Sequence, residues 1–599
     1  MWDGLNETPP AIFAYAAQQI AHLFQQYPRR LVGLNNHHVI TCRADDYERL
    51  ITEHKIDLPL TQVTIQPLDA AMVRQIILSR LGNQHGQKLL EALAEPQYSH
   101  LAGLVRTPLL LMLLCKVYGK SNALPETRGQ LLEQFVYDRI VWEKSWRRDP
   151  NAQVDTAPRF NEYDLIRSLA RLAYAMTKSH KRGTSVQWSW ARQKLAGADT
   201  PLLPEQVRAL ASAADLLEPL AEGRELRFTH QLIQEYFAAF ALRWELERLE
   251  QRRKPTAQRS SLAHMTRYAA PGRRTGWEET LLLLAGLDGQ GSLAHTLVRS
   301  FLSYPLEAAR LLLASGDPDP ALLEEVRTVA RTQISDPREP VQTRLAAGRA
   351  LGLLGDSRFP VTLEQWIRAL EQARAGETGG YFCRVEAGSY PAGPDEQPRR
   401  RITFAQPFWI ARLPIANAQW QAWAEAQGNA VQFASGQNEP NQPITDASWE
   451  QAQAFCRWLS GQLGVAVRLP TEDEWEAAAA GPEGRRYPWG NHWLPDHAAT
   501  QENRDTRGQP GSMPVGCYPS GASHCGALDM AGNVWEWTMG SSAAQPVQEW
   551  PVQRGGNFRS PKTDVSCAAR SPAIHPDDEL YAGFRVVIAL APEAWSPEV

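Results

Sequence analysis

The stretch Asp529-Met-Ala-Gly532-Asn533-Val534-Trp535-Glu536-Trp537-Thr538 lies near the C-terminal end of the sequence. Asp529 and Glu536 flank a Gly-Asn turn whose carbonyl groups can point the same way. Carboxylate and main-chain carbonyl oxygens are together the ligands that Ca²⁺ prefers, while the alternating tryptophans predict a strand with one buried face. The spacing leaves two interpretations open: a metal site, or a tryptophan-rich core strand with a solvent-exposed Glu536.

The composition of the 599-residue chain indicates several domains and excludes some classes of function. A single core does not grow to this size, so three or four domains are expected. The 62 basic and 66 acidic residues nearly balance, which gives no general electrostatic case for binding nucleic acid or a membrane. The longest apolar run, at 109–115, is too short to span a bilayer.

Cysteine usage and the N-terminal sequence bear on the cellular compartment. The seven cysteines include no CxxC motif, which favours a reducing compartment over a disulfide framework. Cys517 and Cys525 are close enough in the sequence to pair if the chain were exported. Residues 1–10 have neither the basic nor the apolar region of a signal peptide, so a cytoplasmic protein is predicted.

Residues 1–105 alternate strands with helices, which predicts a parallel sheet. Short buried strands are expected at 38–42 and 62–66, and a helix is expected to begin after Asp69 and end at Gly82. Asp3-Gly-Leu-Asn-Glu7 has acidic residues of the kind that hold Mg²⁺ in nucleotide hydrolases, and Arg43 follows the first of these strands.

These motifs resemble the Walker B segment and the sensor arginine of NACHT domains, which belong to the STAND class of signalling ATPases. Similar segments follow at 107–111, 124–128 and 228–239. The resemblance implies a partial nucleotide site at Asp3, Glu7 and Arg43, and a winged-helix and helical region over 106–256. No GxxxxGK[ST] phosphate loop occurs in the sequence. ATP and Mg²⁺ are therefore expected only if an upstream or split partner polypeptide supplies that half.

An internal repeat occupies part of residues 257–365. The segments 307–317 and 345–356 are similar, each ends in Gly-Asp, and their final aspartates lie 39 residues apart; 280–288 is a weaker copy. This period resembles HEAT-type helical repeats, which stack to share one core. Either a protein-binding concave face or a spacer between domains is expected here.

From residue 381 onward the sequence predicts short strands, many turns and two well-capped helices. Ser448 with Gln451 and Thr471 with Glu474 form capping-box patterns, as Thr127 with Gln130 does earlier in the chain. Gly481 is expected to end the helix that Thr471 begins. Helical spacing predicts the buried face of the helix after Ser448, which comprises Ala452, Phe455, Cys456, Leu459 and Leu463.

Seven motifs follow one another in this region, at 382–388, 414–417, 467–476, 487–490, 532–537, 554–556 and 583–585. They resemble the formylglycine-generating-enzyme (FGE-sulfatase) family across residues 380–591. The resemblance implies an α+β fold of the C-type-lectin type with little regular structure. It also implies one structural Ca²⁺, held by the Asp529 and Glu536 side chains and by the carbonyls of Gly532 and Val534.

The enzymes of this family have two kinds of activity, and the sequence can be compared with the residues that each one needs. Its oxidase members oxidise a substrate cysteine on copper held by two cysteines after the Arg-Gly-Gly motif. Here Ser560 stands where the first thiolate is expected and Cys567 matches a structural cysteine, so no copper is expected. The sulfoxide-synthase branch needs an HxxxHxE cluster, which the sequence lacks. A formylglycine-generating oxidoreductase acting on a protein cysteine, or an ATPase switch, are the alternatives to a non-catalytic function.

The interval between Gly556 and Gly583 is polar with interleaved aromatic residues, and framework motifs flank it. A variable loop on a rigid scaffold is typical of recognition surfaces, and in similar diversity-generating-retroelement variable proteins the variable residues fall in this interval. The sequence thus predicts a bacterial sensor that recognises a protein ligand, as defence proteins of similar architecture do. The predicted ligand-binding residues are Phe558, Arg559, Lys562, His575, Asp577, Asp578, Glu579 and Tyr581.

Overall fold

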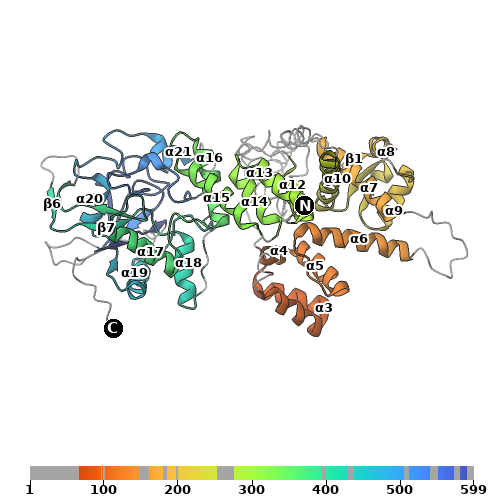
Figure 1. Cartoon of the computed structure of the whole chain (residues 1–599), viewed down its shortest axis with the longest axis horizontal. Coiled ribbons are helices and arrows are strands. Elements are labelled where there is room, and N and C mark those ends of the chain that lie inside the picture. The colour runs from red at the N-terminus through yellow and green to blue at the C-terminus, as the bar shows by residue number, and fades with distance from the viewer. Residues whose placement is uncertain are drawn as a thin grey trace, which may run out of the picture. The chain divides into compact units, whose positions relative to one another are not determined.

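The structure of the chain is a computed structural model, and it divides into two compact units (Figure 1). Unit 1 lies within residues 1–319, and unit 2 is built mainly from residues 320–599. The predicted strands at 38–42 and 62–66, and Asp3, Glu7 and Arg43, lie outside the described residues. The structure describes residues 67–95, 98, 101–146, 161–179, 185–196, 200–251, 276–289, 291–316, 318–393, 400–429, 431, 433, 437–504, 511–539, 551–572 and 581–589.

Unit 1 is mainly helical, and its first described helix begins where the sequence predicts. The Asp69 side chain caps α3 (Ala70–Leu93) by accepting a hydrogen bond from the Met72 backbone at 2.7 Å. The predicted end at Gly82 is confirmed, because its backbone, with φ of 73° and ψ of 169°, is not helical; a second helix follows it directly within α3. Apolar side chains continue beyond Gly82, and Leu89 is fully buried.

Helix α6 (Arg128–Trp146) begins at the predicted Thr127 cap, but the capping box is incomplete, because the Gln130 side chain bonds to the backbone of Glu126 and not to that of Thr127. Thr127 Oγ1 accepts from the Gln130 backbone at 3.1 Å, and the Gln130 side chain accepts from the Glu126 backbone at 2.9 Å. The Thr127 hydroxyl also donates to the Gly286 carbonyl at 2.6 Å, which ties α6 to α12 (Glu278–Asp288). Of the predicted inward face, Leu131, Leu132 and Val136 are buried, and Phe135 is half-buried.

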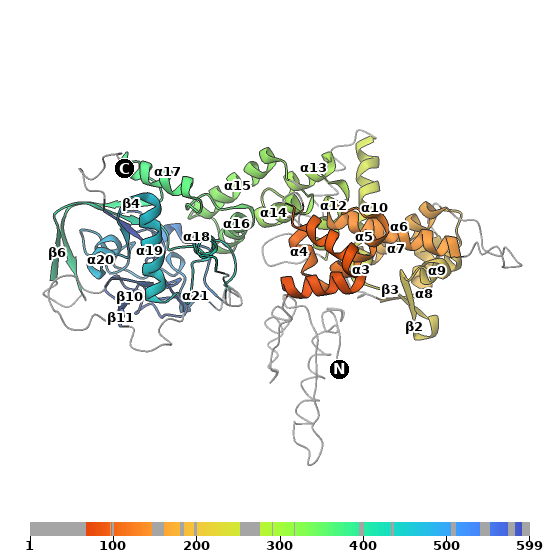
Figure 2. The same ribbon diagram turned by 90° about the horizontal axis from the view of Figure 1, so that it is seen from below.

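Three short strands of unit 1 form an antiparallel sheet in the order β1–β3–β2. Strands β2 and β3 lie beside α8 and α9 (Figure 2). The N-terminal region is thus helical with a small sheet, while its NACHT, winged-helix and HEAT assignments stay predictions. The other elements up to residue 314 are α4 (Ala102–Val105), α5 (Pro108–Ser121), α7 (Glu162–Lys178), β1 (Ser185–Gln187), α8 (Trp188–Ala196), α9 (Pro204–Ala213), β2 (Leu217–Leu220), β3 (Glu225–Phe228), α10 (Gln231–Gln251), α13 (Ser292–Ser300) and α14 (Pro305–Ala314). Among the described residues, no helix has both the length and the apolar character needed to cross a bilayer.

Unit 2 includes residues 301–310 and the helices α15 (Pro320–Ser335), α16 (Val341–Leu354) and α17 (Leu363–Arg374). Trp366 of α17 is buried and packs edge-on against Tyr381, with 5.5 Å between the ring centroids. Helix α17 therefore shares a core with the strands that follow it.

The segment after α16 is fixed to the C-terminal domain by buried polar contacts. Asp356 pairs with Arg358 at 2.6 Å and accepts from Asn441 Nδ2 at 3.1 Å. The same Asn441 amide donates to the Gly348 carbonyl of α16 at 2.7 Å. The helices before residue 368 thus fold together with the domain after it.

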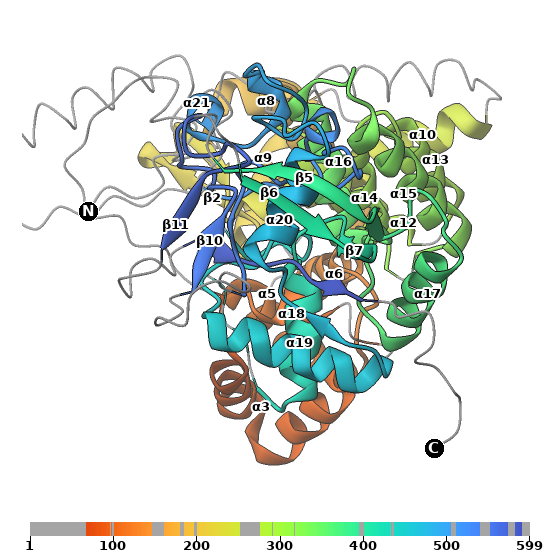
Figure 3. The ribbon, with the colours of Figure 1, turned by 90° about the vertical axis from the view of Figure 1, so that its left-hand side faces the viewer.

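The C-terminal domain is α+β, with two four-stranded sheets and a hairpin (Figure 3). The sheet orders are β4–β7–β13–β8 and β11–β10–β9–β12, and β5 pairs with β6; all pairs are antiparallel except β9 with β12. The strands are β4 (Phe382–Val385), β5 (Gly388–Ala392), β6 (Arg400–Phe404), β7 (Phe408–Ala411), β8 (Val467–Arg468), β9 (Trp535–Trp537), β10 (Val552–Arg554), β11 (Arg570–Pro572), β12 (Ala582–Gly583) and β13 (Val587–Ile588).

The two predicted capped helices are confirmed, as α19 (Trp449–Leu463) and α20 (Glu472–Ala480); the others of this domain are α18 (Asn417–Ala426) and α21 (Gln501–Arg504). Ser448 and Thr471 are their N-caps, each in a capping box, and Gly481 with φ of 67° ends α20. The predicted inner face of α19 is buried at four positions and half-buried at Leu463. Phe455 of α19 packs against Trp420 of α18 and Phe584 in the main core.

Candidate functional site

A pocket of about 560 Å³ opens in the C-terminal domain beside the segment that follows the Arg-Gly-Gly motif. Its wall combines basic side chains and hydroxyl groups with two acids, and it draws on the end of β5, α20, β9 and β11. The lining residues are Pro391, Gly393, Glu476, Ala480, Gly484, Arg485, Arg486, Trp535, Thr563, Asp564, Ser566, Cys567, Ala568, Ala569, Arg570 and Ser571.

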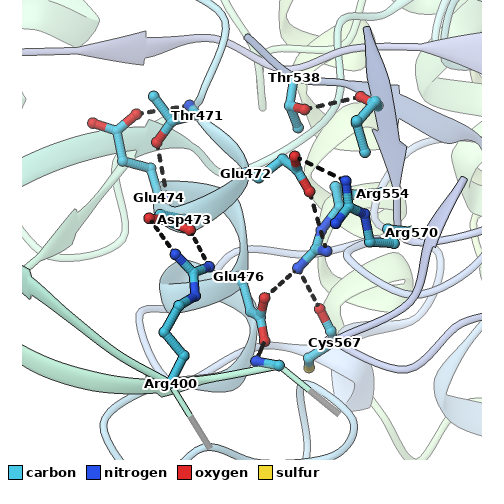
Figure 4. A network of polar contacts seen from close by, with 12 residues as sticks. Arg400, Thr471, Glu472, Asp473, Glu474, Glu476, Thr538, Arg554, Cys567 and Arg570 are labelled. Carbon is cyan, nitrogen blue, oxygen red and sulfur yellow. Dashed lines mark hydrogen bonds and ion pairs between the residues drawn. The ribbon is translucent and has the colours of Figure 1, made fainter. Parts of the chain in front are cut away.

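Helix α20 carries a run of carboxylates at its first turn, beside this pocket (Figure 4). Negative charge is favourable there because the helix N-terminus carries a partial positive charge. Glu474 forms a fork with Arg468, both oxygens at 2.6 Å from the guanidinium, and Asp473 pairs with Arg400 at 3.1 Å. Arginines from β8 and β6 thus fix the start of α20.

Glu476 forms the buried floor of the pocket, and Arg554 holds its carboxylate in place (Figure 4). Their side chains are 6% and 2% exposed, and Arg554 Nη2 lies 2.6 Å from Glu476 Oε2. The same guanidinium nitrogen donates to the Cys567 carbonyl at 3.0 Å, and Gly393 N–H donates to Glu476 Oε1 at 2.7 Å. This pair joins α20, β10 and the loop after β5, so the floor is a rigid part of the scaffold.

The segment where the oxidases hold copper has no thiolate pair among the described residues. Ser560 closes a tight turn: its hydroxyl accepts from the Asn557 backbone at 3.0 Å and donates to the Asn557 side chain at 3.3 Å. Cys567 is buried, and burial raises the pKa of its thiol. The charged groups near this thiol are Glu476, Arg554 and Arg485, with no second cysteine among them.

The predicted Gly-Asn turn is confirmed by the left-handed backbone of Gly532 and Asn533, with φ of 76° and 67°. A Cβ on Gly532 would meet the Ala499 carbonyl, so only glycine fits this approach. The Asn533 side chain exchanges two hydrogen bonds with the Met513 backbone, at 2.8 and 3.2 Å. The turn therefore anchors two distant loops.

Strand β9 follows the turn as predicted, but Glu536 is not solvent exposed. Its side chain is fully buried between two cores, and the Arg585 guanidinium holds both of its oxygens, at 2.6 and 2.7 Å. The Trp475 indole donates to the same carboxylate at 2.7 Å. Both faces of β9 are thus covered in the middle of the strand. This is possible because the buried Arg585 guanidinium compensates the charge of the Glu536 carboxylate.

The four predicted calcium ligands, as they are arranged, do not fit a calcium ion. Ca²⁺ needs free oxygen atoms, and both oxygens of Glu536 already bind Arg585. Asp529 Oδ2 accepts from the Gly516 backbone at 2.7 Å, and burial raises the pKa of this carboxyl to about 6. The Gly532 carbonyl accepts from the Val534 backbone at 3.0 Å. Among the residues in the described ranges, no group of three or more His, Cys, Asp and Glu side chains is placed to hold a metal ion.

Three of the predicted ligand-binding residues lie together. Arg559 is exposed and lies over the Tyr581 ring at 4.5 Å and the Phe558 ring at 5.6 Å. Phe558 itself is buried and supports this cluster from below. Lys562 is exposed, and its backbone bonds to Glu502 and Tyr487 instead. His575, Asp577, Asp578 and Glu579 lie outside the described residues.

Cys517 and Cys525 are close in the sequence, but each of them has other neighbours in the structure. Cys517 is fully buried, with its sulfur 3.9 Å from the Arg344 carbonyl oxygen, whereas the thiol of Cys525 hydrogen-bonds with that of Cys383. The pocket floor was also missed by the sequence analysis. The acidic run of α20 and the Arg554 motif were recognised, but only their pairing across 78 residues reveals the floor.

Comparison with known proteins supports a family assignment for one part of the chain, its C-terminal domain. Residues 368–590 match the sequence model of the FGE-sulfatase family, a sulfatase-modifying factor enzyme 1-like domain. Hercynine oxygenase of Mycobacterium tuberculosis is 29% identical over 212 residues, in a match that covers 28% of this chain and 45% of that protein. The inactive C-alpha-formylglycine-generating enzyme 2 of Mus musculus is 27% identical over 270 residues, with 40% and 81% covered.

Among solved structures, Treponema denticola variable protein 1 is similar with a TM-score of 0.29 and 20% identity, over 35% of this chain and 94% of that protein. The chain spans less than half the length of the hercynine oxygenase that it matches. The family match covers the α+β domain and the seven motifs that follow one another from residue 382 to residue 585. The C-terminal part of this chain, residues 368–590, is therefore an FGE-sulfatase domain.

Proposed function

We propose that this FGE-sulfatase domain is a non-catalytic recognition domain, and that its pocket binds a segment of a protein ligand. The observation that carries the proposal is the state of two residues beside the pocket, Ser560 and Cys567. Ser560 is bonded into a turn and Cys567 is a buried, protonated thiol. Copper-dependent oxidation of a cysteine needs two thiolates at one metal, which this arrangement does not supply.

The pocket wall suits a peptide. Arg485, Arg486 and Arg570 supply guanidinium donors, and Thr563, Ser566 and Ser571 supply hydroxyl groups. Such groups pair with main-chain carbonyls and with carboxylates. The buried Glu476–Arg554 pair keeps the floor in one position, so little ordering is needed on binding. The name of one relative, an inactive formylglycine-generating enzyme, is in line with binding without catalysis.

In the proposed protein the recognition domain is attached to a STAND-like module, in which helical repeats carry the signal. The motifs at 107–111, 124–128 and 228–239 and the helical N-terminal region support this arrangement. The chain by itself is expected not to bind ATP, because it lacks the phosphate loop. Binding of a fluorescent ATP analogue to the purified full chain, with Mg²⁺ present, would contradict that expectation.

The recognition proposal is tested by selecting peptides from a displayed random-peptide library on the full chain. Ala568 lines the pocket and is half-buried, so Ala568→Trp should fill the pocket and abolish binding of the selected peptides. Ala426→Trp, at an exposed end of α18 outside the pocket lining, is the matched control and should leave binding unchanged. Equal binding by both variants would remove the pocket from the proposal.

A second assay separates recognition from catalysis. The full chain is loaded with Cu(I) and given a cysteine-containing peptide with oxygen, and aldehyde formation is measured. No aldehyde is expected. Tight Cu(I) binding together with oxidation of the cysteine would overturn the non-catalytic function and favour the oxidoreductase alternative.

A further inference from the structure

Two cysteines far apart in the sequence meet in the C-terminal domain. Cys383 is buried on β4, and Cys525 is half-buried in the turn from Ser523 to Gly526. Their thiols form a hydrogen bond. A Cβ on Gly526 would lie 3.9 Å from Cys383 Sγ, which places the backbone of this turn directly against β4.

The sulfur of Cys525 also has other polar neighbours. It lies 3.3 Å from the Ser523 hydroxyl, and in its protonated form it donates to the Ala478 carbonyl of α20 at 3.5 Å. The turn is closed by a hydrogen bond from Gly526 N–H to the Ser523 carbonyl at 2.9 Å. Cys525 thus sits at the tip of a short turn, where small shifts of the backbone move its sulfur without disturbing a helix or strand.

The surroundings favour the thiolate of Cys525. The hydrogen bond from Cys383 is the main cause that lowers the pKa of Cys525; burial opposes it, and the Ser523 hydroxyl, the Ala527 backbone and the Arg585 charge assist it. The same hydrogen bond and burial raise the pKa of Cys383, near which Arg412 and Arg585 lie. Tyr390 is the other titratable neighbour of Cys525, and its hydroxyl donates to the Glu386 carbonyl. One sulfur is therefore prepared as a nucleophile and the other as a protonated partner.

We propose that Cys525 is a site of oxidation by hydroperoxides, and that Cys383 resolves the oxidised sulfur to a reversible Cys383–Cys525 disulfide. Two observations carry this inference: the contact of the two thiols, and the partial exposure of Cys525 alone. A thiol pair of this kind is distinct from the peptide pocket and does not depend on the proposed recognition function.

The chemistry balances with hydrogen peroxide as the oxidant. The Cys525 thiolate attacks one peroxide oxygen, the O–O bond breaks, and the released hydroxide takes a proton and leaves as water, so that a sulfenic acid forms. The Cys383 thiol then loses its proton and attacks the Cys525 sulfur. The S–O bond breaks, and the hydroxide takes that proton to leave as a second water. Two electrons pass from the dithiol to the peroxide, and an external dithiol reductant restores the thiols.

The test treats the reduced full chain with hydrogen peroxide and maps the disulfide-linked peptides by mass spectrometry. A linked pair containing Cys383 and Cys525, which disappears after reduction, is expected. Cys456 is the internal reference, because it is buried in the neighbouring core and burial raises its pKa to about 12. If Cys456 or Cys567 is oxidised as fast as Cys525, or if Cys525 links to another cysteine, the proposal is overturned.

Two variants assign the roles of the sulfurs. Cys383→Ser should leave the sulfenic acid on Cys525 unresolved, where a dimedone label traps it, while Cys525→Ser should give neither label nor disulfide. Cys456→Ser is the matched control and should form the disulfide as the original chain does. If Cys383→Ser does not fold, the peptide map of the unaltered chain decides alone: a map without the linkage after complete oxidation of Cys525 overturns the proposal.

Discussion

Arg585 and Glu536 form a forked ion pair that is sealed from solvent. Arg585 Nε lies 2.6 Å from Glu536 Oε2, Arg585 Nη2 lies 2.7 Å from Oε1, and the side chains are 0% and 1% exposed. The remaining donors of Arg585 reach the Ala411 and Leu528 carbonyls at 2.9 and 2.8 Å. One guanidinium thus joins β9, the end of β7 and the loop before the Gly-Asn turn.

Arg585→Met is expected to lower the free energy of unfolding of the C-terminal domain by about 3–5 kcal/mol, because it leaves a buried carboxylate without its cation. The double variant Arg585→Met with Glu536→Gln should lose less than the sum of the two single variants, since neither charge remains. Urea unfolding followed by tryptophan fluorescence measures these differences. Additive losses would show that the two side chains are not energetically coupled.

Calcium is expected to have no effect on the thermal stability of the domain, because Arg585 holds the Glu536 oxygens that the ion would need. Melting temperatures are compared in excess EGTA and in millimolar CaCl₂, with MgCl₂ as the control for ionic strength. A specific rise in the melting temperature with CaCl₂ would support the calcium site predicted at Asp529, Gly532, Val534 and Glu536. It would require the Arg585 contact to rearrange.

Thr471→Ala should destabilise the C-terminal domain by about 1 kcal/mol, the usual cost of losing an N-cap. The Thr471 hydroxyl accepts from the Glu474 backbone at 3.2 Å at the start of α20. Thr563→Ala is the control, because Thr563 is exposed and its hydroxyl bonds only to the adjacent Asp564 at 2.8 Å. The change in urea midpoint of each variant is measured, and equal changes would argue against a capping contribution.

Alkylation of Cys525 by iodoacetamide should stay fast as the pH falls below about 8.5, the ordinary thiol pKa. The pKa of Cys525 is lowered in the fold, so the reactive thiolate persists into the more acidic range. Cys383→Ser removes the main hydrogen bond, and each unit by which the Cys525 pKa then rises above the pH should slow its alkylation about tenfold. Peptide mass spectrometry after timed labelling gives the rates. Identical pH profiles for the two proteins would exclude Cys383 as the cause.

Local chemistry could be predicted from the sequence, but contacts between distant residues could not. The caps at Ser448 and Thr471 and the stop at Gly481 depend on a few neighbouring residues, and all are confirmed. The exposure expected for Glu536 under one interpretation is wrong, because its cation lies 49 residues further along the chain. Gly82, by contrast, is a local signal: its non-helical backbone ends the first helix of α3 as predicted, before a second helix follows.

The same difference between local signals and long-range contacts applies to the candidate site. The motifs at 467–476 and 554–556 were recognised in the sequence, but not the ion pair by which Arg554 fixes Glu476 of the pocket lining. Likewise, the contact of Cys383 with Cys525 has no signal in spacing, because β4 and the Ser523–Gly526 turn are brought together by the fold alone. Of the predicted recognition residues, Arg559, Phe558 and Tyr581 do cluster, because the backbones of Phe558 and Tyr581 both bond to the segment of the Gly-Asn turn, at Asn533 and Trp535.

The hydrogen bonds of Asn441 to Gly348 and Asp356 set a limit on how the domain can be isolated. Homology to the family begins at residue 368, but a gene fragment starting there would encode a protein without either partner of this buried amide. An amide stranded in this way costs about 1–3 kcal/mol, and the core face that α16 covers would become wet. The compact unit that contains these contacts runs from residue 320 and includes residues 301–310 as well, so the segment that matches the family is shorter than the unit that packs together.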